Sequence, residues 1–176
     1  MRRQAVTACL TMTTLVFVGA LTIAARAQSP AKASDGLALS EFKGYESWQA
    51  IAPSETPDGI KAILGNSAMM AAYQAGTPAN GKAVPDGAMM AKIEWAKPPN
   101  DASPYPVSVP GALKSVAFMV KDAKRFAASG GWGYAKFEPA AGSGRLEQTS
   151  PGTACGFACH TRVKARDFVF TEYARR

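Results

Sequence analysis

The sequence has little of the material from which most protein metal sites are built. Its 176 residues include three cysteines and a single histidine. A zinc site of four Cys and His ligands would need all of them, and three cysteines cannot form the dense disulfide framework of a small secreted domain. Charge is also scarce, at 19% of residues, which excludes a highly charged disordered chain and a long coiled coil. The 47% of apolar residues is enough for a core, and the length favours one compact domain.

The first 27 residues have the three regions of a secretory signal peptide. Arg2 and Arg3 form a charged start, residues 5–24 are an apolar run broken only by threonines, and residues 25–27 are an Ala-Arg-Ala cleavage site. A membrane anchor is the alternative, because the apolar run is nearly long enough to span a bilayer. The threonines and the small-x-small end favour a cleaved signal. We therefore expect a mature protein that is exported to the periplasm and is not held in the membrane.

The mature chain carries only a mild positive charge. The net charge falls from +7 to +4 when the three arginines of the signal are removed. The remaining lysines and arginines are scattered and form no basic stripe interleaved with aromatic residues, so nucleic acid is not an expected partner. Export would place the two remaining cysteines in an oxidising compartment, where cysteines normally pair or take part in chemistry.

Hydrophobic periodicity predicts a chain of short strands. Residues 28–39 are small and polar and predict a flexible arm, so the folded domain is expected over residues 40–176, with Ser40 at an N-cap position. Strands are expected at residues 58–66, 88–97, 116–120 and 130–137, short helices at residues 67–73, capped by Ser67, and at 121–128, and loops at residues 76–87, 97–110 and 142–152. The strand–helix alternation of parallel βαβ units is absent, so the expected fold class is mainly β (α+β), an antiparallel sheet with a few short helices.

One segment near the C-terminus gathers most of the chemistry. Cys155, Cys159 and His160, which are both mature cysteines and the only histidine, lie within six residues. A Cys-His pair preceded by another cysteine is typical of covalent c-type haem, in which two thiols add to the haem vinyl groups and the imidazole ligates iron. The spacing of three residues between the cysteines is one more than usual. In a continuous helix His160 would be rotated by about 100° from Cys159, and we expect Gly156 to relieve this by letting the chain loop out before the helix begins.

Three other interpretations of this segment remain open. A disulfide between Cys155 and Cys159 would close a very small loop with little entropic benefit, and it would leave His160 unexplained. A zinc site would need a carboxylate as its fourth ligand. A redox thiol pair would prefer two intervening residues and a thioredoxin-like βαβ context, which the sequence does not have.

The single histidine limits how a haem iron could be ligated. Ligation by two histidines is impossible in this chain. Five methionines remain after cleavage of the signal, Met69, Met70, Met89, Met90 and Met119, and none follows His160. We therefore expect five-coordinate iron with one face open for a small molecule, which favours ligand binding or catalysis over pure electron transfer.

Seven segments, in order along nearly the whole mature chain, resemble the cytochrome P-460 family. They are Tyr45-x-x-Trp48, Ile63-Leu64-Gly65-Asn66, Pro85-Asp86-Gly87 with Ala91-Lys92-Ile93-Glu94-Trp95, Met119-Val120-Lys121-Asp122, Gly130-Gly131-Trp132-Gly133-Tyr134, Cys159-His160-Thr161 and Asp167-Phe168-Val169-Phe170-Thr171. The resemblance implies a β-rich periplasmic domain, usually a homodimer, with one covalent haem c per chain. Members of this family oxidise hydroxylamine to nitrogen oxides, whereas the related beta-type cytochromes c′ bind nitric oxide or carbon monoxide without turnover.

The resemblance also assigns roles to two further residues. Lys92 matches the lysine that the family cross-links to the porphyrin edge. It shares a strand face with Met90 and Glu94, and a solvent-facing lysine paired with Glu94 is the alternative. The family also uses a carboxylate upstream of the haem cysteines as proton acceptor, and Glu147 is the nearest acid here, with a solvated loop position as the alternative.

These expectations combine into one leading function and two alternatives. The leading one is an exported c-type haem oxidoreductase that acts on hydroxylamine, with nitric oxide as a possible second substrate, and passes electrons to an acceptor cytochrome. The first alternative is a non-catalytic protein that binds nitric oxide. The second is a β-rich exported domain with a small disulfide and no haem.

Overall fold

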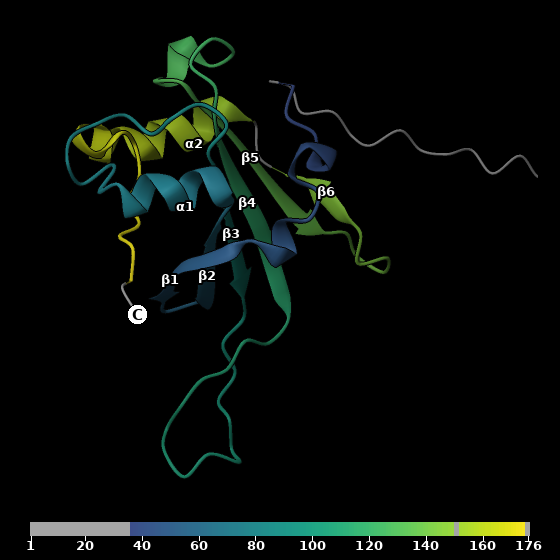
Figure 1. The fold of residues 1–176 in the computed structure, drawn as a ribbon. Coiled ribbons are helices and arrows are strands. Elements are labelled where there is room, and N and C mark those ends of the chain that lie inside the picture. Colours follow the sequence, from purple (N-terminus) through teal and green to yellow (C-terminus); the bar gives the residue numbers. More distant parts are fainter. Residues whose placement is uncertain (1–35, 150–151, 175–176) are drawn as a thin grey trace, which may run out of the picture.

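A six-stranded antiparallel sheet organises the computed structural model, which describes residues 36–149 and 152–174 (Figure 1). The strands lie side by side in chain order, so every connection joins neighbouring strands. They are β1 (Gln49–Thr56), β2 (Gly59–Gly65), β3 (Met89–Trp95), β4 (Leu113–Lys121), β5 (Trp132–Pro139) and β6 (Leu146–Gln148). The mainly β, antiparallel fold class is confirmed. The predicted signal and most of the predicted arm lie outside the described residues.

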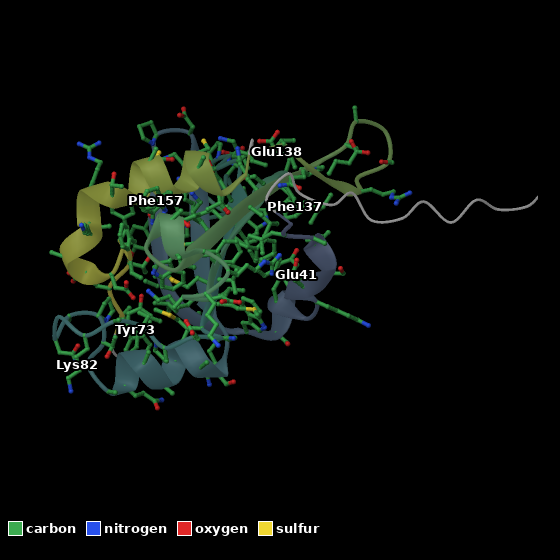
Figure 2. All side chains as sticks on the ribbon, turned by 90° about the horizontal axis from the view of Figure 1, so that it is seen from above. Glu41, Tyr73, Lys82, Phe137, Glu138 and Phe157 are labelled. Carbon is green, nitrogen blue, oxygen red and sulfur yellow. The ribbon has the colours of Figure 1, made fainter. Side chains whose placement is uncertain are left out.

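Short helices cover the two faces of this sheet. Two are α-helices, α1 (Ser67–Gln74) and α2 (Thr153–His160), and four are 3₁₀ turns, Leu39–Phe42, Tyr45–Ser47, Ala127–Ser129 and Thr161–Arg166. Figure 1 shows α1 and α2 on one side of the sheet and the N-terminal turns on the other. Figure 2 shows the same arrangement from above, with Phe157 on α2, Tyr73 on α1 and Glu41 on the first N-terminal turn. Among the described residues, none of the helices has the length and apolar character needed to cross a membrane.

The alternation of β3 sorts its side chains between two cores. Met90 packs into the cluster that contains the α1 methionines, Trp132 and Tyr134. Ala91 packs on the opposite face, in a cluster closed by the N-terminal turns. Lys92 therefore lies on the same face as Met90, as the sequence pattern predicted, and α1 and α2 lie on this side of the sheet.

Two expected helix features differ in the structure. Asn66, not Ser67, caps α1, because its side-chain oxygen accepts a hydrogen bond from the backbone N–H of Met69 at 3.0 Å. The helix expected over residues 121–128 is wrong. Lys121 instead ends β4, paired with Trp132, and only the 3₁₀ turn Ala127–Ser129 is helical. The Asp122 side chain accepts hydrogen bonds from two backbone N–H groups of the intervening turn, which stabilises the turn in place of a helix.

The two outer strands were not expected. β1 is an edge strand whose residues are mostly exposed, and Pro53 lies in it. β6 has three residues and pairs with the end of β5, inside the region expected to be loop. The folded part also begins slightly before Ser40, because Leu37 is fully buried and the first turn starts at Leu39.

Candidate functional site

A cavity of about 790 Å³ lies on the helical face of the sheet, bordered by α2. β1 to β5 form its floor, and the segment that follows the last 3₁₀ turn closes another side. Its lining includes Ile63, Met90, Lys92, Met119 and Tyr134 from the sheet, Cys155, Cys159 and His160 from α2, and Phe170, Thr171 and Glu172 from the C-terminal segment. This volume lies within the range of cavities that hold small molecules and cofactors.

The two cysteines lie one helical turn apart on a continuous helix. Residues 153–160 are all helical, so the extra residue between Cys155 and Cys159 is accommodated by the helix, and the expected loop at Gly156 does not form. Gly156 has a different role. A Cβ at this position would lie 2.5 Å from Cβ of Tyr134, so the missing side chain lets α2 pack directly on β5. Both cysteines line the same cavity.

Both thiols are free and exposed. The small disulfide considered from the sequence is therefore not formed. In residues 36–149 and 152–174, no group of three or more His, Cys, Asp and Glu side chains is arranged to hold a metal ion. The carboxylate that a zinc site would need as its fourth ligand is thus not placed beside Cys155, Cys159 and His160.

His160 is held in the form that can ligate a metal. Its Nδ1 lies 2.7 Å from the backbone oxygen of Phe168. A carbonyl oxygen can only accept a hydrogen bond, so Nδ1 carries the proton and the lone pair is on Nε2. Burial lowers the pKa of His160, which favours the neutral ring, and the positive charge of Lys92 lowers it further. The hydrogen bond to Phe168 acts in the opposite direction.

Lys92 faces the same cavity from β3. The Lys92 side chain is exposed, because it opens onto the cavity. The protein around the amine still desolvates it, and this burial lowers the pKa of Lys92. Lys92 on β3 and Cys159 and His160 on α2 line the same cavity from opposite elements, and the charge of Lys92 acts on the pKa of His160. Glu94 raises the pKa of Lys92 by a smaller amount, and its own ion pairs are with Lys61 at 3.8 Å and Lys114 at 3.3 Å.

Glu147 lies elsewhere in the fold. It is exposed on β6, opposite Glu138, and it is not part of the cavity lining. The carboxylates that do line the cavity are Glu94 and Glu172. The structure therefore brings together four of the five residues singled out in the sequence, and a role for Glu147 stays a prediction.

Only some of the methionines and aromatic residues of the strands reach the cavity. Of the five methionines, Met90 and Met119 reach the cavity. Of the aromatic residues in the central strands, Tyr134 borders it, whereas Trp132 is fully buried and the Phe118 ring packs in the cluster on the opposite face of the sheet. Phe170 and Thr171 belong to a segment of the family resemblance, whereas nothing in the sequence singles out Glu172, because the place of these residues beside α2 depends on the turn that follows it.

Comparison with known proteins adds one positive finding. A family model described as Cytochrome P-460 matches residues 42–171, which include all six strands, both α-helices and most of the cavity lining. A search of curated proteins gives no significant match.

Proposed function

The chain belongs to the cytochrome P-460 family, which implies a haem cofactor, and we propose that the cavity beside α2 holds one covalently attached haem c. Cys155 and Cys159 would carry it and His160 would ligate its iron. The observation that carries the proposal is the shared cavity: two free thiols one helical turn apart and an imidazole whose Nδ1 is hydrogen-bonded to the Phe168 oxygen all open onto it.

The residues fit this group chemically. Attachment requires each thiol to add across a vinyl double bond, so that a carbon–sulfur bond forms and the thiol hydrogen moves to the neighbouring carbon. No external oxidant is needed, and both exposed thiols are free to react. The imidazole has its lone pair on Nε2 as a ligand requires. Side chains such as Ile63, Met90 and Met119 supply apolar contacts for a macrocycle.

We further propose that Lys92 is cross-linked to the ring edge, as the family resemblance implies. A neutral amine is the nucleophile, and burial lowers the pKa of Lys92. Replacing a ring C–H by a C–N bond releases two protons and two electrons, which a peroxide would take up. Proteolysis of the purified haem protein followed by mass spectrometry tests this. The expected result is porphyrin on the Lys92 peptide, and a Lys92 peptide recovered without porphyrin contradicts the cross-link.

The proposed activity is oxidation of hydroxylamine in the periplasm, with electrons passed to an acceptor cytochrome. Bound haem would supply an iron centre that changes oxidation state and has one face open to a small nitrogen compound. His160 would ligate the iron, and the chain has no second histidine that could also ligate it. Oxidation of hydroxylamine to nitric oxide releases three electrons and three protons, so a proton acceptor and an electron acceptor are both required.

A nitric oxide binding protein is the second candidate, and one observation favours it. Glu147, the expected proton acceptor, is not at the cavity. The two candidates are separated by mixing the purified haem protein with hydroxylamine and an oxidised acceptor cytochrome. Reduction of the acceptor that depends on hydroxylamine supports the enzyme. Nitric oxide binding seen in the absorption spectrum, with no reduction of the acceptor, supports the binding protein.

The role of Glu147 can be tested in the same assay. If it accepts a proton during turnover, Glu147→Gln should lower the rate of acceptor reduction. Glu172→Gln changes a carboxylate that does line the cavity and serves as the comparison. Unchanged turnover in Glu147→Gln removes this residue from the reaction.

A further inference from the structure

A buried ion pair joins the end of β4 to the turn that follows the last 3₁₀ turn. Lys121 Nζ lies 2.8 Å and 2.9 Å from the two carboxylate oxygens of Asp167, and it also donates to the backbone oxygen of Gly130 at 3.1 Å. The Lys121 and Asp167 side chains are only 7% and 12% exposed. The amine also lies 5.1 Å from the centroid of the Trp132 ring. Lys121 is thus fully engaged within the protein and is not a surface charge.

The turn held by this pair has an unusual backbone. Asp167 and Phe168 both have left-handed conformations, with φ of 47° and 63°, which are costly for a bulky residue such as phenylalanine. The other carboxylate contact of Asp167 is to the backbone N–H of Val84, which donates to it at 2.7 Å. The Phe168 ring lies over Gly130, where a Cβ would come within 2.3 Å of the ring. The turn is therefore fixed from three directions by elements distant in the sequence.

This turn presents the acceptor for the histidine. The backbone oxygen of Phe168 accepts the hydrogen bond from His160 Nδ1 at 2.7 Å. The direction of that carbonyl depends on the left-handed conformation of Phe168, and the conformation depends on the contacts of Asp167 and Phe168 just described. A continuous set of contacts thus runs from Lys121 through Asp167 and Phe168 to His160.

We propose that Lys121 and Asp167 are positioning residues for His160, an inference that rests on the proposed role of His160 as the iron ligand. Metal-ligating histidines depend on the partner of their second ring nitrogen for orientation and basicity. Stability alone is a poor explanation for the pair, because an ion pair taken out of water stabilises a fold little compared with apolar residues of similar size. A strained backbone that is held by several contacts is instead typical of a functional constraint.

The test is made on the haem-loaded protein and does not rely on activity. Resonance Raman spectroscopy of the ferrous form reports the iron–histidine stretching frequency, and the band can be assigned directly because the chain has one histidine. Lys121→Met is expected to weaken the hydrogen bond to Nδ1 and so make the imidazole a weaker donor to iron. The iron–histidine band should shift to lower frequency, and the reduction potential should rise. An unchanged band and potential in Lys121→Met would overturn the inference.

A second variant separates positioning from folding. Lys121→Met leaves the Asp167 carboxylate buried without its cation, so Lys121→Met/Asp167→Asn removes that charge, and asparagine tolerates the left-handed conformation. The shifts should persist in this double variant even where its melting temperature recovers. A return of the band to the wild-type frequency together with the melting temperature would show that the pair acts only through stability.

Val116→Ala provides the matched control. Val116 is fully buried in the cluster on the opposite face of the sheet, so its truncation lowers the melting temperature without touching the turn. It should leave the iron–histidine band at the wild-type frequency. The wild-type spectrum distinguishes the two proposals. If the wild type shows no iron–histidine band, the proposed ligand role of His160 fails. If the wild-type band is present and Lys121→Met does not shift it, only the inference about Lys121 fails.

Discussion

The neutral forms of His160 and Lys92, which both line the cavity, are favoured over the charged forms more strongly than they would be in water. Burial lowers the pKa of His160 and of Lys92, and the positive charge of Lys92 lowers the pKa of His160 further. Each role proposed for these residues needs the neutral form, since a metal ligand needs the free lone pair of imidazole and a nucleophile needs the free amine. The same environment therefore prepares both groups.

The pKa of His160 predicts how the stability of the haem-free protein depends on pH. The folded state disfavours protonation of His160, whereas the unfolded chain takes up the proton near pH 6.5. As the pH falls through 6.5 the unfolded state binds more protons than the folded state, so the free energy of unfolding should decrease until the pH passes below the folded pKa. The slope is at most about 1.4 kcal/mol per pH unit for one group.

Urea unfolding of the Cys155→Ser/Cys159→Ser variant between pH 5.5 and 7.5 would measure this dependence. His160→Gln in the same background is the control, and it should lose that part of the pH dependence because the chain has no other histidine. Identical pH dependence in the two proteins would contradict the predicted direction of the His160 pKa.

At the scale of single elements, the start of α1 is stabilised by Asn66. Its side-chain oxygen accepts hydrogen bonds from the N–H groups of Met69 and Met89, both at 3.0 Å, and its amide donates to the Gly87 oxygen at 2.9 Å. Asn66→Ala removes a helix cap and a link to β3, and it should lower the free energy of unfolding by about 2 kcal/mol. Ser67→Ala is the matched control and should change it by less than about 0.5 kcal/mol. Denaturant unfolding of both variants measures these changes. A larger loss of stability in Ser67→Ala than in Asn66→Ala would contradict the observed cap.

The contact between α2 and β5 predicts whether Gly156→Ala raises or lowers the stability of the protein. Alanine normally stabilises a helix relative to glycine by roughly 1 kcal/mol. At Gly156 the added Cβ would meet Tyr134 at 2.5 Å, and relieving that clash should cost about 1–3 kcal/mol. Gly156→Ala should therefore destabilise the protein and reduce the yield of haem-loaded protein. Ala158→Gly, at an exposed position of the same helix, measures the propensity effect alone. A more stable Gly156→Ala protein would contradict the close packing.

The elements that sequence could predict are those with a strong local pattern. β2, β3 and the centre of β4 follow from alternation, because successive side chains of a strand lie on opposite faces of the sheet. β1 and β6 were missed because an exposed edge strand and a three-residue strand leave little hydrophobic periodicity. The cap of α1 was placed one residue late because Asn66 and Ser67 are both good capping residues and only their geometry separates them.

The site was predictable to a similar extent. The grouping of Cys155, Cys159 and His160 is local in sequence, and the strand pattern predicts that Lys92 shares a face with Met90, as it does in the structure. The role of Gly156 was not found, because it depends on Tyr134, a residue from another strand. The support from Lys121 and Asp167 joins segments 46 residues apart and is visible only in three dimensions.

At the scale of the whole molecule, the sheet provides the floor of the cavity together with Lys92, and α2 provides Cys155, Cys159 and His160. One face of the sheet packs on the N-terminal turns, and the other is shared between α1, α2 and the cavity. The cavity beside α2 therefore lies next to the two hydrophobic clusters and does not interrupt either of them. It also explains how three residues between the cysteines can be used, since a continuous helix brings both thiols to the cavity wall.

Export and self-association are properties of the whole molecule that we propose from the sequence and the family resemblance. The mature protein is expected to begin at Gln28, to be located in the periplasm without a membrane anchor, and to form a homodimer. N-terminal sequencing of the exported protein and light scattering during gel filtration test these statements. An uncleaved chain retained in the membrane would contradict the first, and a monomer the second.

The central claim, covalent haem on Cys155 and Cys159, is tested most directly by mass spectrometry of the exported protein. The chain is produced in a bacterial host that carries the c-type maturation machinery, digested, and the peptide that contains residues 155–160 is isolated. We predict that this peptide carries the mass of one haem, and that Cys155→Ser/Cys159→Ser abolishes the addition. A peptide recovered at its unmodified mass, from protein that was exported and folded, would contradict the proposed function.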